Sequence, residues 1–101
     1  MIYRGTTPTV KIHINNSTFH VSELTDCCIA IENDSGRHLQ LFTNCTCDDT
    51  DNTVSVRLTH DQTMAFEPGF LEVQFTATLN GDEMCSEILR TEIGDNKRLR
   101  G

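Results

Sequence analysis

Residues 71–81, with the sequence L-E-V-Q-F-T-A-T-L-N-G, decide the fold of this chain. Every second residue before the last pair is apolar: Leu71, Val73, Phe75, Ala77 and Leu79. A period of two is typical of a strand that buries one face. The Asn80-Gly81 pair that follows is a strong indication of a two-residue hairpin, of type I′. We therefore expect a long strand, a tight turn and a return strand over residues 83–93, whose ambiguous register a bulge near Ile88 and Leu89 would resolve.

The same alternation occurs earlier in the chain, at residues 9–14 and 53–58. Residues 27–31 are apolar on both faces, as in a central strand, and a turn cluster at residues 33–36 joins them to residues 38–43 as a hairpin. Short strands separated by frequent turns are typical of sandwiches. The pattern predicts an all-β protein, an antiparallel, Ig-like β-sandwich of six to seven strands with one short helical turn.

The helical turn has its own local pattern. Thr59 with Gln62 three residues later matches a capping box, which predicts a helix over residues 60–65. Pro68-Gly69 then predicts a type II turn with glycine at positive φ. We place the sandwich at residues 10–93, between an N-terminal arm at 1–9 and a basic C-terminal tail at 94–101.

Composition limits the classes of partner. A chain of 101 residues is expected to form one domain, and its 15 acidic against 8 basic residues, net charge -7, disfavour nucleic acid and membrane surfaces. Neither the apolar core of a signal peptide nor a membrane-length apolar run is present, so we expect synthesis in a cytoplasm without secretion. Five cysteines made in a reducing compartment argue against a disulfide framework.

Two close pairs of cysteines, Cys27-Cys28 and Cys45-x-Cys47, raise the question of zinc. Zinc sites usually use C-x2-C pairs, and neighbouring residues of a strand point to opposite faces, so Cys27 and Cys28 are poor co-ligands. Free cysteine is usually buried as a small hydrophobe. We therefore expect these thiols to pack rather than to bind metal or carry redox chemistry.

Three carboxylates, Asp48, Asp49 and Asp51, raise the same question for calcium. An EF-hand loop needs glycine at its sixth position and glutamate at its twelfth; counted from Asp49, these positions hold Val54 and His60. The motif fails, and a solvated polar turn explains the loop, although an adventitious hard-cation site stays open. We expect no metal and no cofactor.

Catalytic signatures are also missing from the sequence. No histidine lies two or four residues from another, and no nucleophile elbow, cysteine-protease motif or glycine-rich phosphate loop occurs. We expect a protein that is not an enzyme and has no catalytic residues.

Two segments carry a resemblance to a known group. Arg4 to Thr9, R-G-T-T-P-T, resembles the start of small proteins encoded among the tail and baseplate genes of phages and prophages of Gram-positive bacteria. Residues 54–63 and 68–75 resemble the V-x-V-x-L-T-x-x-x-T segment and following long strand of the same group. The chain is also loosely similar to the N-terminal β-sandwich of phage upper baseplate proteins. The cysteine pairs are not part of this pattern.

The resemblance implies a non-enzymatic structural component of the virion, assembled in several copies or as a homo-oligomer with other virion proteins. Because two segments lie outside the core pattern, we expect them to make the partner contacts: Arg4, Gly5, Thr6, Thr7, Pro8 and Thr9 in the arm, and Lys97, Arg98 and Arg100 in the tail. A bacterial regulator or inhibitor with the same fold stays open. So does a host-facing receptor- or carbohydrate-binding module, although the chain has no Trp and one Tyr for stacking on sugars.

Overall fold

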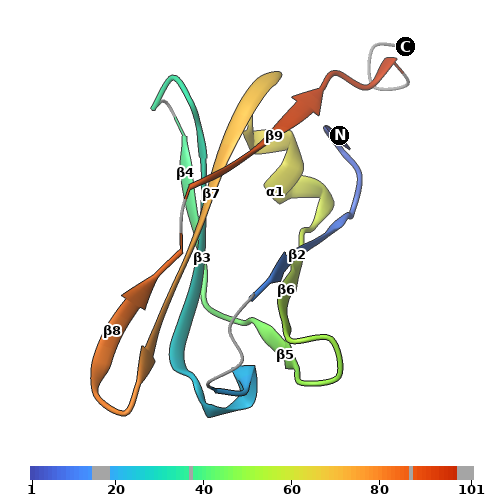
Figure 1. The fold of residues 1–101 in the computed structure, drawn as a ribbon. Helices are drawn as coiled ribbons and strands as arrows, with labels where there is room; N and C mark the ends of the chain where they lie inside the picture. Colours follow the sequence, from blue (N-terminus) through green and yellow to red (C-terminus); the bar gives the residue numbers. More distant parts are fainter. Residues whose placement is uncertain (15–18, 37, 87, 98–101) are drawn as a thin grey trace.

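The computed structural model describes residues 1–14, 19–36, 38–86 and 88–97, which form two packed β-sheets (Figure 1). The larger sheet has the strand order β1-β9-β7-β3-β4, with β8 also paired to β7. Its strands are β1 (Ile2–Tyr3), β3 (Thr25–Asn33), β4 (Leu39–Phe42), β7 (Gly69–Leu79), β8 (Asp82–Cys85) and β9 (Leu89–Gly94). The smaller sheet has the order β2-β6-β5, from β2 (Thr9–His13), β6 (Thr53–Arg57) and β5 (Thr46–Asp48). The prediction of an all-β sandwich is confirmed.

The strand expected from residues 71–79 is the centre of the larger sheet. β7 has 11 residues and pairs with β3 on one side and with β8 and β9 on the other. Its predicted inward residues Leu71, Val73, Phe75 and Ala77 are all buried. Asn80 and Gly81 both take positive φ, 51° and 87°, which is the requirement of the predicted type I′ turn.

The return strand is divided in two. Thr76 pairs with Cys85 in β8, and Val73 pairs with Leu89 in β9, so three steps along β7 oppose four steps along the return segment. One extra residue therefore shifts the register between Cys85 and Leu89, as the predicted bulge would. Ser86 joins the two parts, because its backbone N–H donates to the Phe75 carbonyl at 2.8 Å.

Helix α1 (His60–Ala65) has the predicted capping box. The Gln62 backbone N–H donates to Thr59 Oγ1 at 3.2 Å, and Gln62 Oε1 accepts from the Thr59 backbone N–H at 2.8 Å. The turn after it differs from the prediction: Gly69 has φ 140° and begins β7, whereas the glycine of a type II turn has φ of about 80°. The positive φ of Gly69, which glycine adopts readily, therefore occurs at the first residue of β7.

The core lies between the two sheets and is closed at its ends by short helical segments (Figure 1). Phe66 follows α1 and is fully buried at one end, and Val21 in the 3-10 turn η1 (Val21–Glu23) is fully buried at the other. None of the helices in the described ranges is long and apolar enough to cross a membrane.

Candidate functional site

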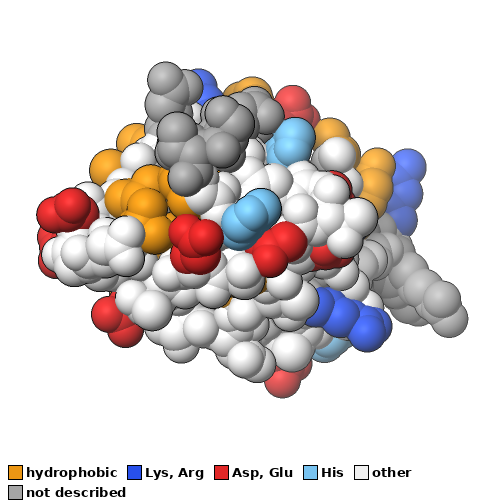
Figure 2. Space-filling view, turned by 60° about the horizontal axis from the view of Figure 1, so that its bottom comes forward, with side chains coloured by type: hydrophobic (Ala, Val, Ile, Leu, Met, Phe, Trp, Pro, Cys, Tyr) orange, Lys and Arg blue, Asp and Glu red, His pale blue; other side chains and the backbone are white. Residues whose placement is uncertain are grey.

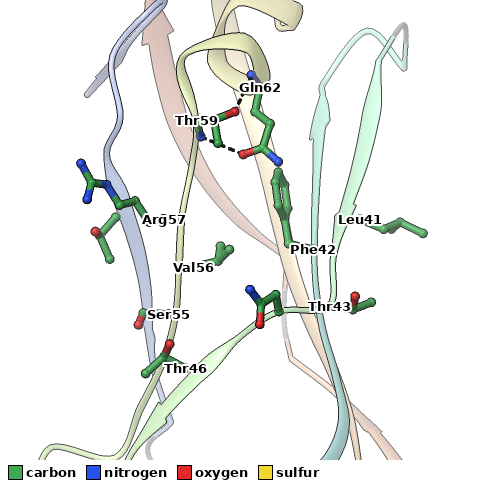
Figure 3. A pocket seen from close by; sticks show the side chains of 11 residues that line it. Leu41, Phe42, Thr43, Thr46, Ser55, Val56, Arg57, Thr59 and Gln62 are labelled. Carbon is green, nitrogen blue, oxygen red and sulfur yellow. Dashed lines mark hydrogen bonds between the residues drawn. The ribbon is translucent and has the colours of Figure 1, made fainter.

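A cleft opens between the edge of β4 and the smaller sheet (Figure 3), with a volume of about 620 Å³. Apart from three apolar residues, Leu41, Phe42 and Val56, it is lined by hydroxyl and amide side chains and one arginine: Thr9, Thr43, Asn44, Thr46, Ser55, Arg57, Thr59 and Gln62. Gln62 is held by its hydrogen bonds to Thr59, as the dashed lines in Figure 3 show. Histidine, cysteine and carboxylate side chains do not line this cleft, so none of these groups stands beside its serine and threonine hydroxyls to act as a general base.

The same cleft is poorly suited to sugars. Its only aromatic ring belongs to Phe42, which is 6% exposed and packs in the core, so it presents no ring face for stacking. The more exposed aromatic side chains, Tyr3 in β1 and Phe70 in β7, do not line the cleft, and the Arg90 guanidinium covers the Phe70 ring at 4.9 Å from its centroid.

The cysteines of the two sequence pairs are largely packing residues. Cys27, Cys45 and Cys47 are half-buried against the hydrophobic core, as predicted for small hydrophobes. The Cys45 thiol donates to the Phe42 carbonyl oxygen at 3.3 Å and lies 3.9 Å from the Cys27 carbonyl oxygen. Burial, together with the neighbouring Cys47 thiol, raises the pKa of Cys27 to about 11, and burial also raises the pKa of Cys45. The spacing of the cysteines along the sequence did not predict that Cys27 lies beside Cys45 and Cys47.

The three aspartates of the 48–51 loop accept hydrogen bonds from three different residues. Asp49 accepts from the Ser22 backbone N–H at 3.0 Å and from Ser22 Oγ at 2.6 Å, and these bonds lower the pKa of the Asp49 carboxyl. Asp48 accepts from the Thr50 N–H, and Asp51 accepts from the Thr53 hydroxyl. On the face in Figure 2 the acidic side chains are spread apart, and no His, Cys, Asp and Glu group within the described ranges is placed to hold a metal.

The predicted partner-contact residues of the arm make contacts within the chain. Ile2 and Tyr3 form β1 beside β9, and Thr9 begins β2, so the arm is part of both sheets. The Arg4 guanidinium donates to the Met64 carbonyl at 3.0 Å and lies 3.7 Å from the Asp95 carboxylate.

The middle of the hexapeptide is fastened to α1. The Gly5 N–H donates to Thr63 Oγ1 at 2.9 Å, and the Thr63 hydroxyl donates to the Thr6 carbonyl at 2.8 Å. Thr7 Oγ1 accepts from Arg57 at 3.3 Å, and the Pro8 carbonyl accepts from the Leu58 N–H at 2.9 Å. Whether this segment also contacts a partner stays a prediction.

The tail is only partly described. Lys97 is exposed near the end of the larger sheet, after Gly94 at the end of β9. Arg98 and Arg100 lie outside the described residues. The predicted role of these three cations therefore stays a prediction as well.

A surface that sequence analysis missed lies on the outer side of the larger sheet. We call it the outer leucine face: Leu39, Leu41, Ile88, Glu32 and Glu72. The three apolar side chains are 52%, 64% and 57% exposed, and they border a shallow hollow of about 250 Å³ together with the two glutamates.

The outer leucine face arises because the leucines of β4 point outward, whereas the apolar residues of a sandwich strand usually point toward the core. Polar Gln40 points inward and donates to the Gln62 carbonyl at 2.9 Å, so Leu39 and Leu41 point outward. Phe42 pairs with buried Ile29 and fixes this register, since a shift by one residue would expose the phenylalanine.

The two glutamates of this face are directly opposite one another in the β3–β7 pair. Such partners have Cβ atoms about 4.5–5.5 Å apart, and like charges there are destabilising. Arg90 is opposite Glu72 on β9, but its guanidinium pairs with Asp34 at 3.1 Å. The face therefore combines exposed leucines with two close negative charges.

Comparisons of this chain with protein-family models, with curated proteins and with solved structures found no match.

Proposed function

We propose that this protein is a non-enzymatic structural component of a phage or prophage virion, in the tail or baseplate, and that it acts through protein–protein assembly. The resemblance of Arg4 to Thr9 to the start of tail-region proteins supports the virion setting. The lining of the cleft beside β4, which lacks histidine, cysteine and carboxylate side chains, and its buried Phe42 ring favour assembly over catalysis or sugar binding.

The observation that carries the proposal is the outward alternation of β4. A single exposed leucine is ordinary. Here two leucines point outward while a glutamine faces the core, and together they form an apolar surface that is exposed in the single chain. Covering Leu39, Leu41 and Ile88 on assembly would remove this apolar area from water.

We propose that the basic tail of a second copy of this chain binds the outer leucine face. A partner for this face needs apolar groups for the leucines and cations for Glu32 and Glu72, because facing carboxylates are stabilised by a nearby positive charge. The segment Lys97-Arg98-Leu99-Arg100 has three cations around one leucine. A tail that binds the face of the next copy makes a heterologous contact, which closes into a ring or extends as a stack.

Sedimentation equilibrium over a range of concentrations tests the contact. We expect the unmodified chain to associate, with weaker association at high salt, and we expect Leu41→Glu and a truncation after Asn96 each to weaken it at least tenfold. Thr46→Glu is the matched control, because it adds the same charge at an exposed strand position of the other sheet. A monomer at all concentrations, or equal weakening by Thr46→Glu, would count against the outer leucine face.

The virion setting needs a separate experiment. Particles purified from the producing strain should contain this chain in a fixed number of copies per particle, measured by quantitative mass spectrometry. Its absence from particles would overturn the virion role and leave the association measurement to stand alone.

A further inference from the structure

Two cysteines from opposite sheets, Cys27 on β3 and Cys47 on β5, both pack against the core of the sandwich. Cys27 belongs to β3, where the register with β7 shifts by one residue between Thr25 and Cys28. Asp26 has φ 52° within this irregularity. Two residues thus oppose one on β7, as in a β-bulge. Cys28 is opposite Thr76, which is exposed, so Cys28 points outward, and its neighbour Cys27 points toward the core by the alternation of a strand.

Cys47 reaches the same place from β5. Its pairing partner across the smaller sheet is Val54, which is fully buried, and directly paired residues lie on the same face. Cys47 therefore also points inward. Both residues pack against the hydrophobic core. The sulfur of Cys45, two residues before Cys47, lies 3.9 Å from the Cys27 carbonyl oxygen, which places this part of the smaller sheet beside Cys27. The neighbouring Cys47 thiol accordingly contributes to the raised pKa of Cys27.

We propose that Cys27 and Cys47 are a disulfide-forming pair that links the two sheets covalently when the protein meets a small disulfide oxidant such as glutathione disulfide. The inference goes beyond the proposed function and does not depend on it.

The chemistry is thiol–disulfide exchange in two steps. One cysteine, as its thiolate, attacks a sulfur of glutathione disulfide and releases one glutathione, which leaves a mixed disulfide on the protein. The second cysteine attacks the protein sulfur of that mixed disulfide and releases the second glutathione. The two protein thiols are oxidised, the one oxidant disulfide is reduced, and the two protons are carried by the two glutathione thiols.

The third thiol of the cluster is a weaker candidate for this bond. Cys45 donates to the Phe42 carbonyl, which points its sulfur at the backbone. Cys45 and Cys47 are also separated by one extended residue, which puts their Cα atoms roughly 6.6 Å apart, near the upper limit for a disulfide. Cys28 is directed outward and Cys85 is exposed.

The experiment maps the linkage in the full chain. Reduced protein is incubated with glutathione disulfide in mildly alkaline buffer, free thiols are alkylated, and digested peptides are analysed by mass spectrometry. We expect a Cys27–Cys47 peptide link that is absent from Cys27→Ser and Cys47→Ser and present in Cys45→Ser and Cys85→Ser. Five alkylated or glutathione-capped thiols, or a link that includes Cys45, would overturn the inference.

A second measurement does not depend on variants that might fail to fold. Because the bond closes a loop of about 20 residues, oxidation should raise the thermal midpoint of the unmodified chain by roughly 10–20 °C. The link should also form faster as the pH rises from 7 toward 9, because Cys27 is held as a neutral thiol. An unchanged midpoint in protein whose link has been mapped would show that the bond strains the sandwich and contradict the proposed geometry.

Discussion

Replacing Thr63 by valine should separate the N-terminal arm from helix α1. The Thr63 side chain is fully buried, and its single hydroxyl accepts from the Gly5 N–H at 2.9 Å and donates to the Thr6 carbonyl at 2.8 Å. Valine has nearly the same shape but no hydroxyl, so both backbone groups lose their partner while the packing volume is kept. The variant therefore isolates the hydrogen bonds.

The cost follows from these two bonds. Each contributes about 1 kcal/mol, and a backbone group left buried without a partner costs about 1–3 kcal/mol. Because the two sites are only partly buried, water can satisfy some of this loss, so we expect T63V to lower the free energy of unfolding by about 2–4 kcal/mol. For a domain of this size the thermal midpoint should fall by roughly 10–20 °C.

Urea and thermal unfolding followed by circular dichroism measure this loss. Thr63→Ser keeps the hydroxyl and loses one methyl, which should cost about 1 kcal/mol. Thr76→Val makes the same chemical change at an exposed position of β7 and should be close to neutral. If T63V proved as stable as T76V, or more stable than T63S, the hydroxyl would not be what holds the arm.

Three further perturbations test other parts of the sandwich. Asn33→Leu should cost about 2–4 kcal/mol in urea unfolding, because the buried Asn33 amide donates to the Glu67 carbonyl and accepts from its N–H. The pKa of the Asp49 carboxyl is lowered because Ser22 donates to it. The carboxylate therefore stabilises the folded state above pH 3.8, and this stabilisation is lost as the pH falls through the lower folded pKa. Asp49→Asn should remove this acid dependence of the thermal midpoint. The pKa of Cys27 is raised, so in reduced protein the neutral thiol stabilises the folded state below pH 9.0, and this stabilisation is lost as the pH rises to about 11. Cys27→Ser should therefore reduce the dependence of the thermal midpoint on pH over that window. An unchanged slope would contradict the burial of the thiol.

The elements that sequence predicts are those with local causes. The alternation of Leu71 to Leu79, the Asn80-Gly81 turn and the Thr59–Gln62 capping box each depend on residues a few positions apart, and the structure has all three. Their physics is that of one strand, one turn and one helix end, so no knowledge of the rest of the chain is needed.

The features that sequence did not predict depend on distant contacts. Thr63 and Gly5 are separated by 58 positions, so the arm's attachment follows only from the finished fold. Cys27 and Cys45 are 18 positions apart, and their contact follows only from the packing of the two sheets. The outward leucines of β4 follow from the competing burial of Phe42, which overrides the local expectation that leucine faces the core.

The central claim is that the outer leucine face of one copy binds the basic tail of another copy. Zero-length carbodiimide crosslinking of a mixture of unlabelled and nitrogen-15-labelled chains tests it directly, because Lys97 is one of only two lysines and Lys11, on the smaller sheet, is an internal control. The account predicts mixed-isotope amide links from Lys97 to Glu32 or Glu72. Links confined to single chains, or mixed-isotope links that occur equally from Lys11, would contradict it.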